Sequence, residues 1–156
     1  MNDLAFYQQY HQNSINKFIH FLCIPIISFC IINFLACLFV VLDDKLTTIH
    51  QIWFRGDKIA LAFYCCYYYL NYDIFVATIM MAYLNCIIYL ADMFRKKNQN
   101  WFYHNCIVFF ISWIFQFIGH YIEGRQPALV HGISQSFLVA PMFVIQYIFP
   151  SFLQIQ

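Results

Sequence analysis

Two short polar segments contain the residue types in this sequence that could do chemistry. They cover residues 10–20 and 119–129, and each lies at the edge of a long apolar run. Their imidazole, carboxamide, carboxylate and guanidinium groups belong to His11, Asn16, His20, His120, Glu123 and Arg125. Such groups are costly to desolvate at the boundary of hydrocarbon. Their clustering there indicates a polar site rather than a lipid-facing surface.

The spacing of these groups is typical of a metal site. His120 and Glu123 are three residues apart, like the carboxylate and histidine pairs of helix-bundle iron sites. Neutral imidazoles with a carboxylate and open coordination positions suit Fe(II) and oxygen chemistry. Each histidine taken alone could instead be an interfacial residue that hydrogen-bonds its neighbours, with Arg125 pairing Glu123 structurally. The combined pattern favours a site.

His11 and His20 can share this site only if the chain changes direction between them. They are nine residues apart, which is about 180° around an ideal helix. A helix that begins at Asn13 or Ser14, both good capping residues, would let His11 lie off its end. Asn16 and His20 then share one face of that helix.

The composition predicts an integral membrane protein. Of 156 residues, 63% are hydrophobic and 10% are charged, against about 25% charged in soluble domains. The net charge of +1 and the absence of a basic patch exclude a nucleic-acid partner. No linker-like stretch divides the chain, so we expect one domain over residues 1–156.

The apolar runs predict an all-α membrane bundle of four to five transmembrane segments, preceded by a short interfacial helix. The interfacial helix covers residues 4–10, and the apolar stretches cover residues 17–42, 59–91, 101–122 and 128–149, the last kinked at Pro141. The 33 residues from 59 to 91 would form a helix of about 50 Å, too long for a hydrocarbon core of about 30 Å. We therefore expect a hairpin that turns at residues 71–73. The loops are residues 43–58 and 92–100.

Five crossings would place both polar segments on the same side of the membrane. Six basic residues then lie on the other side: Lys45, Arg55, Lys58, Arg95, Lys96 and Lys97. Only Lys17 and Arg125 oppose them, and the positive-inside rule places the six-residue face in the cytosol or matrix.

Two motifs of the sequence match a known family. They read Phe6-Tyr7-x-x-Tyr10-His11-x-Asn13-x-x-Asn16-x-x-x-His20, and Trp113-x-x-Gln116-Phe117-Ile118-Gly119-His120 followed by Arg125-x-Pro127-Ala128-Leu129. The chain resembles the small membrane dioxygenases of 2-hydroxy fatty acids, of the fungal type that acts in phytosphingosine breakdown. The resemblance implies an endoplasmic-reticulum protein that uses Fe(II) and O2 to shorten 2-hydroxy fatty acids by one carbon, which is α-oxidation. It also implies that His11, His20 and His120 are metal ligands or essential site residues.

The sequence departs from the family pattern at three places. Ser14 stands where the family usually has Pro, Glu123 is one place from the expected acid, and His131 with Gly132 stands where an Asp-Asn pair is expected. His131 is thus a candidate fourth imidazole ligand, or the lost acid marks a site that no longer turns over.

Two function classes follow. In the first, the chain is a non-haem iron dioxygenase whose substrate lies in the bilayer and chelates iron through its 2-hydroxyl and carboxylate. Arg125 would anchor the carboxylate, with Glu123 and Asn16 as further catalytic candidates. In the second, the chain is a non-catalytic accessory subunit of a larger membrane complex, such as a respiratory-chain assembly of the mitochondrial inner membrane. The expected partners are membrane lipids, a long-chain 2-hydroxy acyl substrate or bound lipid, and, in the second class, other membrane subunits.

The predicted topology can be tested by cysteine labelling. In a cysteine-free background, Asp3→Cys and Lys97→Cys should react with a membrane-impermeant maleimide from opposite sides of sealed vesicles, because three of the five predicted crossings lie between the amino terminus and the basic loop. Labelling of both positions from the same side would contradict the topology.

Overall fold

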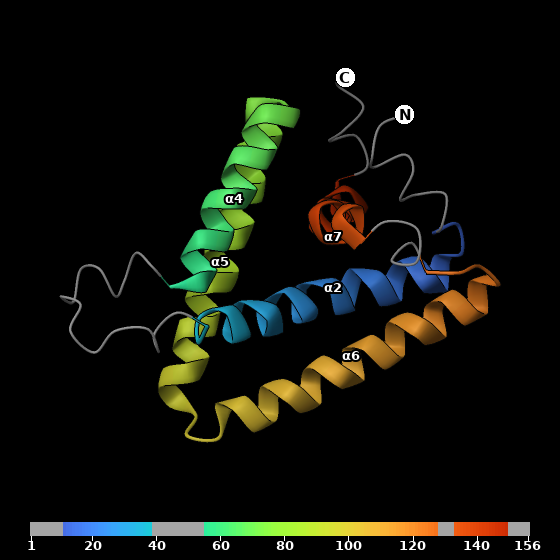
Figure 1. Ribbon diagram of the computed structural model, residues 1–156. Helices are drawn as coiled ribbons and strands as arrows, with labels where there is room; N and C mark the ends of the chain where they lie inside the picture. Colours follow the sequence, from blue (N-terminus) through green and yellow to red (C-terminus); the bar gives the residue numbers. More distant parts are fainter. Residues whose placement is uncertain (1–10, 39–54, 128–132, 150–156) are drawn as a thin grey trace, which may run out of the picture. The chain divides into compact units, whose positions relative to one another are not determined.

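The computed structural model describes residues 11–38, 55–127 and 133–149. Within these ranges the chain forms five helices and no strand (Figure 1). The helices are α2 (Ser14–Leu35), α4 (Gly56–Asn71), α5 (Ile74–Lys97), α6 (Trp101–Glu123) and α7 (Ile133–Ile148). The predicted all-helical class is confirmed, whereas the short helix predicted over residues 4–10 lies outside the described residues.

Three helices of the described part are long and apolar enough to cross a membrane. They are α2, α5 and α6, with 22, 24 and 23 residues, and a span needs about 20. The helices α4 and α7 have 16 residues each, or about 24 Å of helix, which is less than the ~30 Å of the hydrocarbon core. These lengths indicate a membrane protein, as the composition predicted.

Contacts between residues divide the chain into two compact units. One consists of Met1–Ile27 and Ile107–Gln156, and the other of Ser28–Cys106. The first unit contains both polar segments that the sequence singled out. The second contains α4 and α5. The single domain expected over residues 1–156 stays a prediction.

Asn13, one of the two residues that the sequence offered as a cap, caps the start of α2. Its Oδ1 accepts a hydrogen bond from the backbone N–H of Ile15 at 2.8 Å. A capping side chain satisfies one of the N–H groups that the first turn leaves without a helical partner. The helix therefore starts at Ser14, three residues before the apolar stretch that was predicted from residue 17, and His11 lies outside it.

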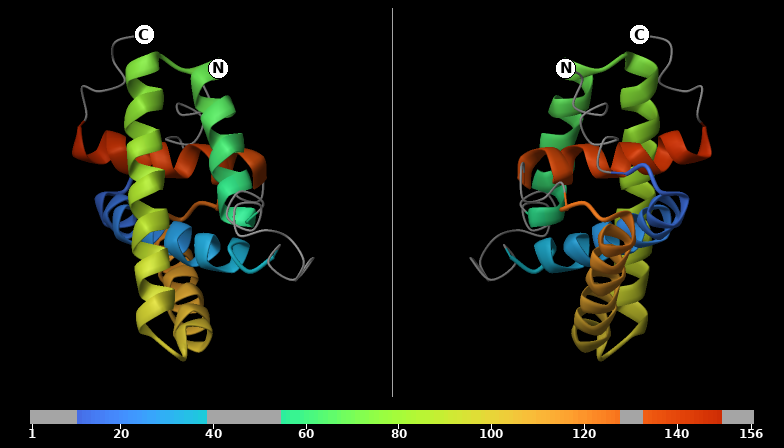
Figure 2. Two further views of the ribbon diagram at one scale, coloured as in Figure 1. Left: turned by 90° about the vertical axis from the view of Figure 1, so that its left-hand side faces the viewer. Right: turned by 90° about the vertical axis from the view of Figure 1, so that its right-hand side faces the viewer.

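The apolar stretch from 59 to 91 folds as the predicted hairpin. Helix α4 ends at Asn71 and α5 begins at Ile74, and the two helices lie side by side (Figures 1 and 2). Asp73 caps α5 by accepting a hydrogen bond from the N–H of Phe75 at 2.7 Å. The charge that interrupts the apolar stretch thus marks the turn because it begins a helix.

The loop predicted over residues 92–100 is wrong in most of its length, since α5 continues to Lys97. The last turn of α5 is basic, and positive charge is favoured there by the helix dipole. Asp92 also pairs with Arg95, one turn further along the same helix. Charged residues that end an apolar run therefore extend the helix here. Helix α4 likewise begins at Gly56, inside the loop predicted before it.

A network of polar side chains joins four helices within the second unit. Asn33 is fully buried, and its carboxamide donates to Oδ1 of Asn105 at 3.0 Å. Asn105 donates in turn to the carbonyl of Cys30 at 3.1 Å. Arg95 donates to Oδ1 of Asn33 at 2.7 Å and pairs with Asp92. Buried amides of α2 and α6 are thereby connected to a charged pair of α5.

The same network continues to the start of α4. Arg55 donates to Oδ1 of Asp92 at 2.8 Å and holds Asp57 with two hydrogen bonds. Asp57 is fully buried. Burial by itself raises the pKa of the Asp57 carboxyl, but the hydrogen bond and charge of Arg55 hold it below its ordinary value. The sequence identified the arginines only as charges of one membrane face, and the fold supplies their partners.

Removal of the central amide should weaken this network. Asn33→Leu should destabilise the protein by about 1–3 kcal/mol, because Arg95 and Asn105 each lose a partner within the network. Asn85→Leu is the matched control, since Asn85 is exposed on α5 and donates to the Met81 carbonyl of its own helix at 2.8 Å. Thermal unfolding in detergent micelles should give a lower midpoint for the Asn33 variant than for the control. Equal midpoints would show that the network adds nothing to stability.

Candidate metal centre

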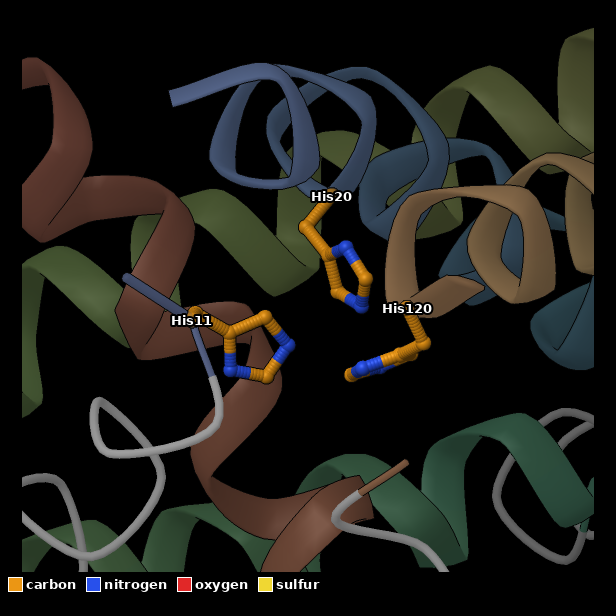
Figure 3. Close-up of side chains that lie close together, drawn as sticks. All are labelled: His11, His20 and His120. Atoms are coloured by element: carbon orange, nitrogen blue, oxygen red, sulfur yellow. The ribbon is translucent and has the colours of Figure 1, made fainter. Parts of the chain in front are cut away.

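Three histidines converge in the first unit (Figure 3). His11 precedes α2, His20 lies in its second turn, and His120 lies in the last turn of α6. The ring centroids are 4.3 Å apart for His11 and His20, 5.0 Å for His11 and His120, and 4.8 Å for His20 and His120. All three side chains are buried. The convergence that the sequence predicted is confirmed, and it depends on the helix start at Ser14, which leaves His11 off the end of α2.

The hydrogen bond of His20 sets its ring in the form that binds metal. Nδ1 lies 3.0 Å from the carbonyl oxygen of Asn16. A carbonyl can only accept, so Nδ1 carries the proton and donates it. In the neutral ring, Nε2 then has the lone pair that a metal requires. Backbone carbonyls commonly orient metal-binding histidines in this way.

The three imidazoles fit a divalent metal ion. His120 Nδ1 is buried and has no hydrogen-bond partner in the described part of the chain. A buried polar atom without a partner is costly, and a bound cation would provide one. Metal–imidazole bonds of about 2.0–2.1 Å place two ligating nitrogens at most about 4.2 Å apart. One ligand atom of each histidine lies within 4.8 Å of the others, so small rotations of the rings would complete a shared coordination sphere.

Glu123 lies outside this group of imidazoles, and its carboxylate instead accepts hydrogen bonds from the segment around the start of α2. Its Oε1 accepts hydrogen bonds from the backbone N–H groups of Gln12 and Asn13, the latter at 3.2 Å. Its Oε2 accepts a hydrogen bond from Nδ2 of Asn16 at 2.5 Å. A carboxylate beside these N–H groups is also favoured by the dipole of α2. The end of α6 is thus fastened to the segment that carries His11.

Arg125 lies just past this end of α6, and its side chain is exposed. The helix ends with Gly124 at φ +69°, in the left-handed region that glycine adopts without strain. The N–H of Gly124 bonds the carbonyl of Tyr121 at 3.1 Å, and that of Arg125 bonds the carbonyl of His120 at 3.3 Å. These two bonds form a Schellman motif, which closes the helix one turn after His120.

A glycine allows α2 and α6 to approach closely beside the histidines. A Cβ atom added at Gly119 would overlap the Asn16 carboxamide oxygen and lie 3.3 Å from its Cγ. Asn16 is fully buried. Its side chain bonds Glu123 and its carbonyl bonds His20, so the predicted catalytic candidate Asn16 orients two other residues of the site.

Helix α7 places one aromatic residue, Phe143, against His11, and the sequence analysis did not predict this contact. The Phe143 ring lies 5.2 Å from the His11 ring, measured between centroids. Phe143 and its neighbours Met142 and Val139 are buried. An apolar residue well inside an apolar helix gives no sequence signal of a metal centre, and only its contact with His11 reveals the role. The proposed fourth ligand, His131, lies outside the described residues.

Comparison with known proteins agrees with this geometry. A family model described as 2-hydroxy-palmitic acid dioxygenase Mpo1-like matches residues 2–152. The chain belongs to the Mpo1-like family. The Saccharomyces cerevisiae protein 2-hydroxy-palmitic acid dioxygenase MPO1 is 30% identical to this member over 144 residues, which cover 92% of this chain and 75% of that protein. No solved structure matches the chain. The family resemblance of the two polar segments is thereby confirmed.

The close approach at Gly119 can be tested by a double-mutant cycle. Gly119→Ala should destabilise the metal-free protein by about 1–3 kcal/mol, because the new methyl group overlaps the buried Asn16 side chain. In an Asn16→Ala background the same substitution should have a much smaller effect, since the obstructing carboxamide is gone. Thermal unfolding of the four proteins in micelles measures both effects. Equal losses in the two backgrounds would rule out this contact as the cause.

Proposed function

We propose that the chain is a dioxygenase of long-chain 2-hydroxy fatty acids that holds Fe(II) with His11, His20 and His120. This proposal rests on the buried group of three imidazoles, whose ligand atoms lie within 4.8 Å of one another. Its family is described by 2-hydroxy-palmitic acid dioxygenase activity. Imidazole nitrogens with open positions suit ferrous iron and oxygen chemistry.

The charge of the centre favours an anionic substrate. Three neutral imidazoles leave the +2 charge of a divalent ion uncompensated in a buried place, where unpaired charge is costly. The nearby carboxylate of Glu123 is engaged by the segment that carries His11 and by Asn16. A fatty acid carboxylate would supply the missing negative charge. A 2-hydroxyl group beside it adds a second oxygen.

The surfaces next to the histidines suit a substrate that arrives through lipid. Phe18 and Leu22 are exposed on the face of α2 opposite the buried His20. Phe117 and Tyr121 on α6, three residues before and one residue after His120, are also exposed. An acyl chain can lie against such faces while its polar head reaches the centre. The endoplasmic reticulum is the membrane that the family resemblance suggests, with the mitochondrial inner membrane as the alternative.

The reaction balances without a further reductant. The bond between C1 and C2 of the 2-hydroxy acid breaks, C2 becomes the carboxyl carbon of the shortened acid, and C1 leaves as CO2. The substrate gives four electrons to one O2, and the remaining product is water. Bound ferrous iron would supply the Lewis acid and redox centre for this step. The chain's own residues would hold the ion, exclude bulk water and orient the substrate head.

Two substitutions separate metal binding from substrate binding. His120→Ala should abolish iron binding and consumption of 2-hydroxyhexadecanoic acid under O2, because two imidazoles are too few for the centre. Arg125→Ala should raise KM while the iron content stays unchanged, because a guanidinium can hold a carboxylate but cannot coordinate a cation. His104→Ala is the matched control, since His104 is exposed on α6. Metal analysis and oxygen consumption measure the two properties.

The wild-type protein provides the decisive comparison. Iron at about one per chain, with loss of a 2-hydroxy acid, supports the enzyme. A wild-type protein without metal that leaves 2-hydroxy acids untouched and stays bound to other membrane subunits would favour the accessory-subunit hypothesis.

A further inference from the structure

His11 differs from the other two histidines in how the fold places its side chain. It precedes α2, whereas His20 lies within α2 and His120 lies within α6 (Figure 3). In a helix the backbone restricts the direction in which a side chain leaves. The direction of the His11 ring therefore depends on what packs around it. The backbone that follows His11 is bonded to Glu123, and those bonds hold the main chain rather than the ring.

The rings of three described residues lie close to the His11 ring. The distances between ring centroids are 4.3 Å to His20, 5.0 Å to His120 and 5.2 Å to Phe143, whose ring is inclined at 45°. Two of these neighbours are themselves proposed ligands, and their rings have to rotate slightly to complete a shared coordination sphere. Phe143 has no atom that can coordinate a cation. Its ring can therefore support His11 without taking part in the coordination.

Helix α7 holds Phe143 in a fixed place. Met142, Phe143, Val144 and Ile145 follow one another in the sequence, and all four are buried. At about 100° per residue, four successive positions cover most of the circumference of a helix. A helix that is apolar and buried on every side is part of the packed interior, where side chains keep one conformation. The support beside His11 is thus a rigid one.

A second aromatic contact attaches α7 to α2. The rings of Phe21 and Tyr147 are stacked, with centroids 4.9 Å apart and planes inclined at 28°. Tyr147 lies one turn after Phe143, and all of these residues belong to the first unit. This pair joins the same two parts of the chain as the contact between Phe143 and His11, but neither of its members is a proposed ligand. It therefore provides a matched comparison.

We propose that Phe143 is a positioning residue that holds the His11 ring in the direction required to bind the metal ion. This inference rests on the proposed function, which makes His11 a ligand. A ligand that is oriented before the metal arrives loses less conformational freedom on binding. Contacts that orient metal ligands from outside the ligand set commonly change metal affinity by about 10-fold to 100-fold. Without the Phe143 ring, His11 samples other conformations and the metal binds more weakly.

The test compares zinc affinity with stability. The full chain in micelles is titrated calorimetrically with Zn²⁺, which has no redox chemistry, and the metal-free protein is unfolded thermally. Phe143→Ala should lower the zinc affinity about tenfold, which is about 1.4 kcal/mol. Tyr147→Ala is the matched control, because it removes the other ring contact between α7 and α2. It should lower the unfolding midpoint and keep the wild-type zinc affinity.

The outcomes separate this inference from the proposed function. Phe143→Ala protein with the wild-type zinc affinity overturns the inference alone. An equal loss of zinc affinity in both variants also overturns it, because the loss then comes from the packing of α7 rather than from His11. Wild-type protein that binds no zinc overturns both the inference and the proposed function.

A conservative variant keeps the test decisive if Phe143→Ala does not fold. Phe143→Leu keeps an apolar side chain in the packed helix and removes the ring. It should lower the zinc affinity about threefold, because an aromatic contact adds a modest free energy beyond the area that it buries. Wild-type affinity in this variant overturns the inference.

Discussion

The arrangement of the candidate centre depends on one carboxylate. Glu123 ends α6 and accepts hydrogen bonds from the backbone of Gln12 and Asn13 and from the side chain of Asn16. These hydrogen bonds tie the segment that carries His11 to the end of α6. Through Glu123, residues more than 100 positions apart in the chain meet, and three imidazoles face one another. Glu123 thus supports the candidate metal centre by connecting the protein segments around it, and it is not one of the three imidazole ligands.

Apolar surroundings make this kind of polar contact decisive. Lipid offers no water to satisfy a backbone or side-chain group, so polar groups within the helices must find partners in the protein. Asn16 meets much of this demand, since its Nδ2 donates to Glu123 and its carbonyl accepts from His20. In the second unit, Asn33 and Arg95 do the same. A group that departs from this rule, such as His120 Nδ1, is therefore informative about a ligand.

The neutral donor set has consequences for the choice of substrate. In the proposed function, the three imidazoles of the described residues bring no negative charge to a divalent cation, so the centre would gain most from an anionic oxygen ligand. A 2-hydroxy fatty acid has such a head and an apolar tail, which matches the exposed apolar faces of α2 and α6. Phe143, on the third helix of this site, α7, packs its ring against His11.

The sequence by itself determined the class, the turn at Asp73, the cap at Asn13 and the family, because each depends on local composition, periodicity or a short motif. It also brought His11, His20 and His120 together, since the break between the first two is a local capping signal. The sequence did not predict the length of α5, because the charges of Asp92 and Arg95 read equally as a loop. The task of Glu123 and the partners of Arg55 and Asn33 depend on pairings between distant segments. Only the tertiary structure decides these, because no local pattern records which remote atom will satisfy a buried polar group.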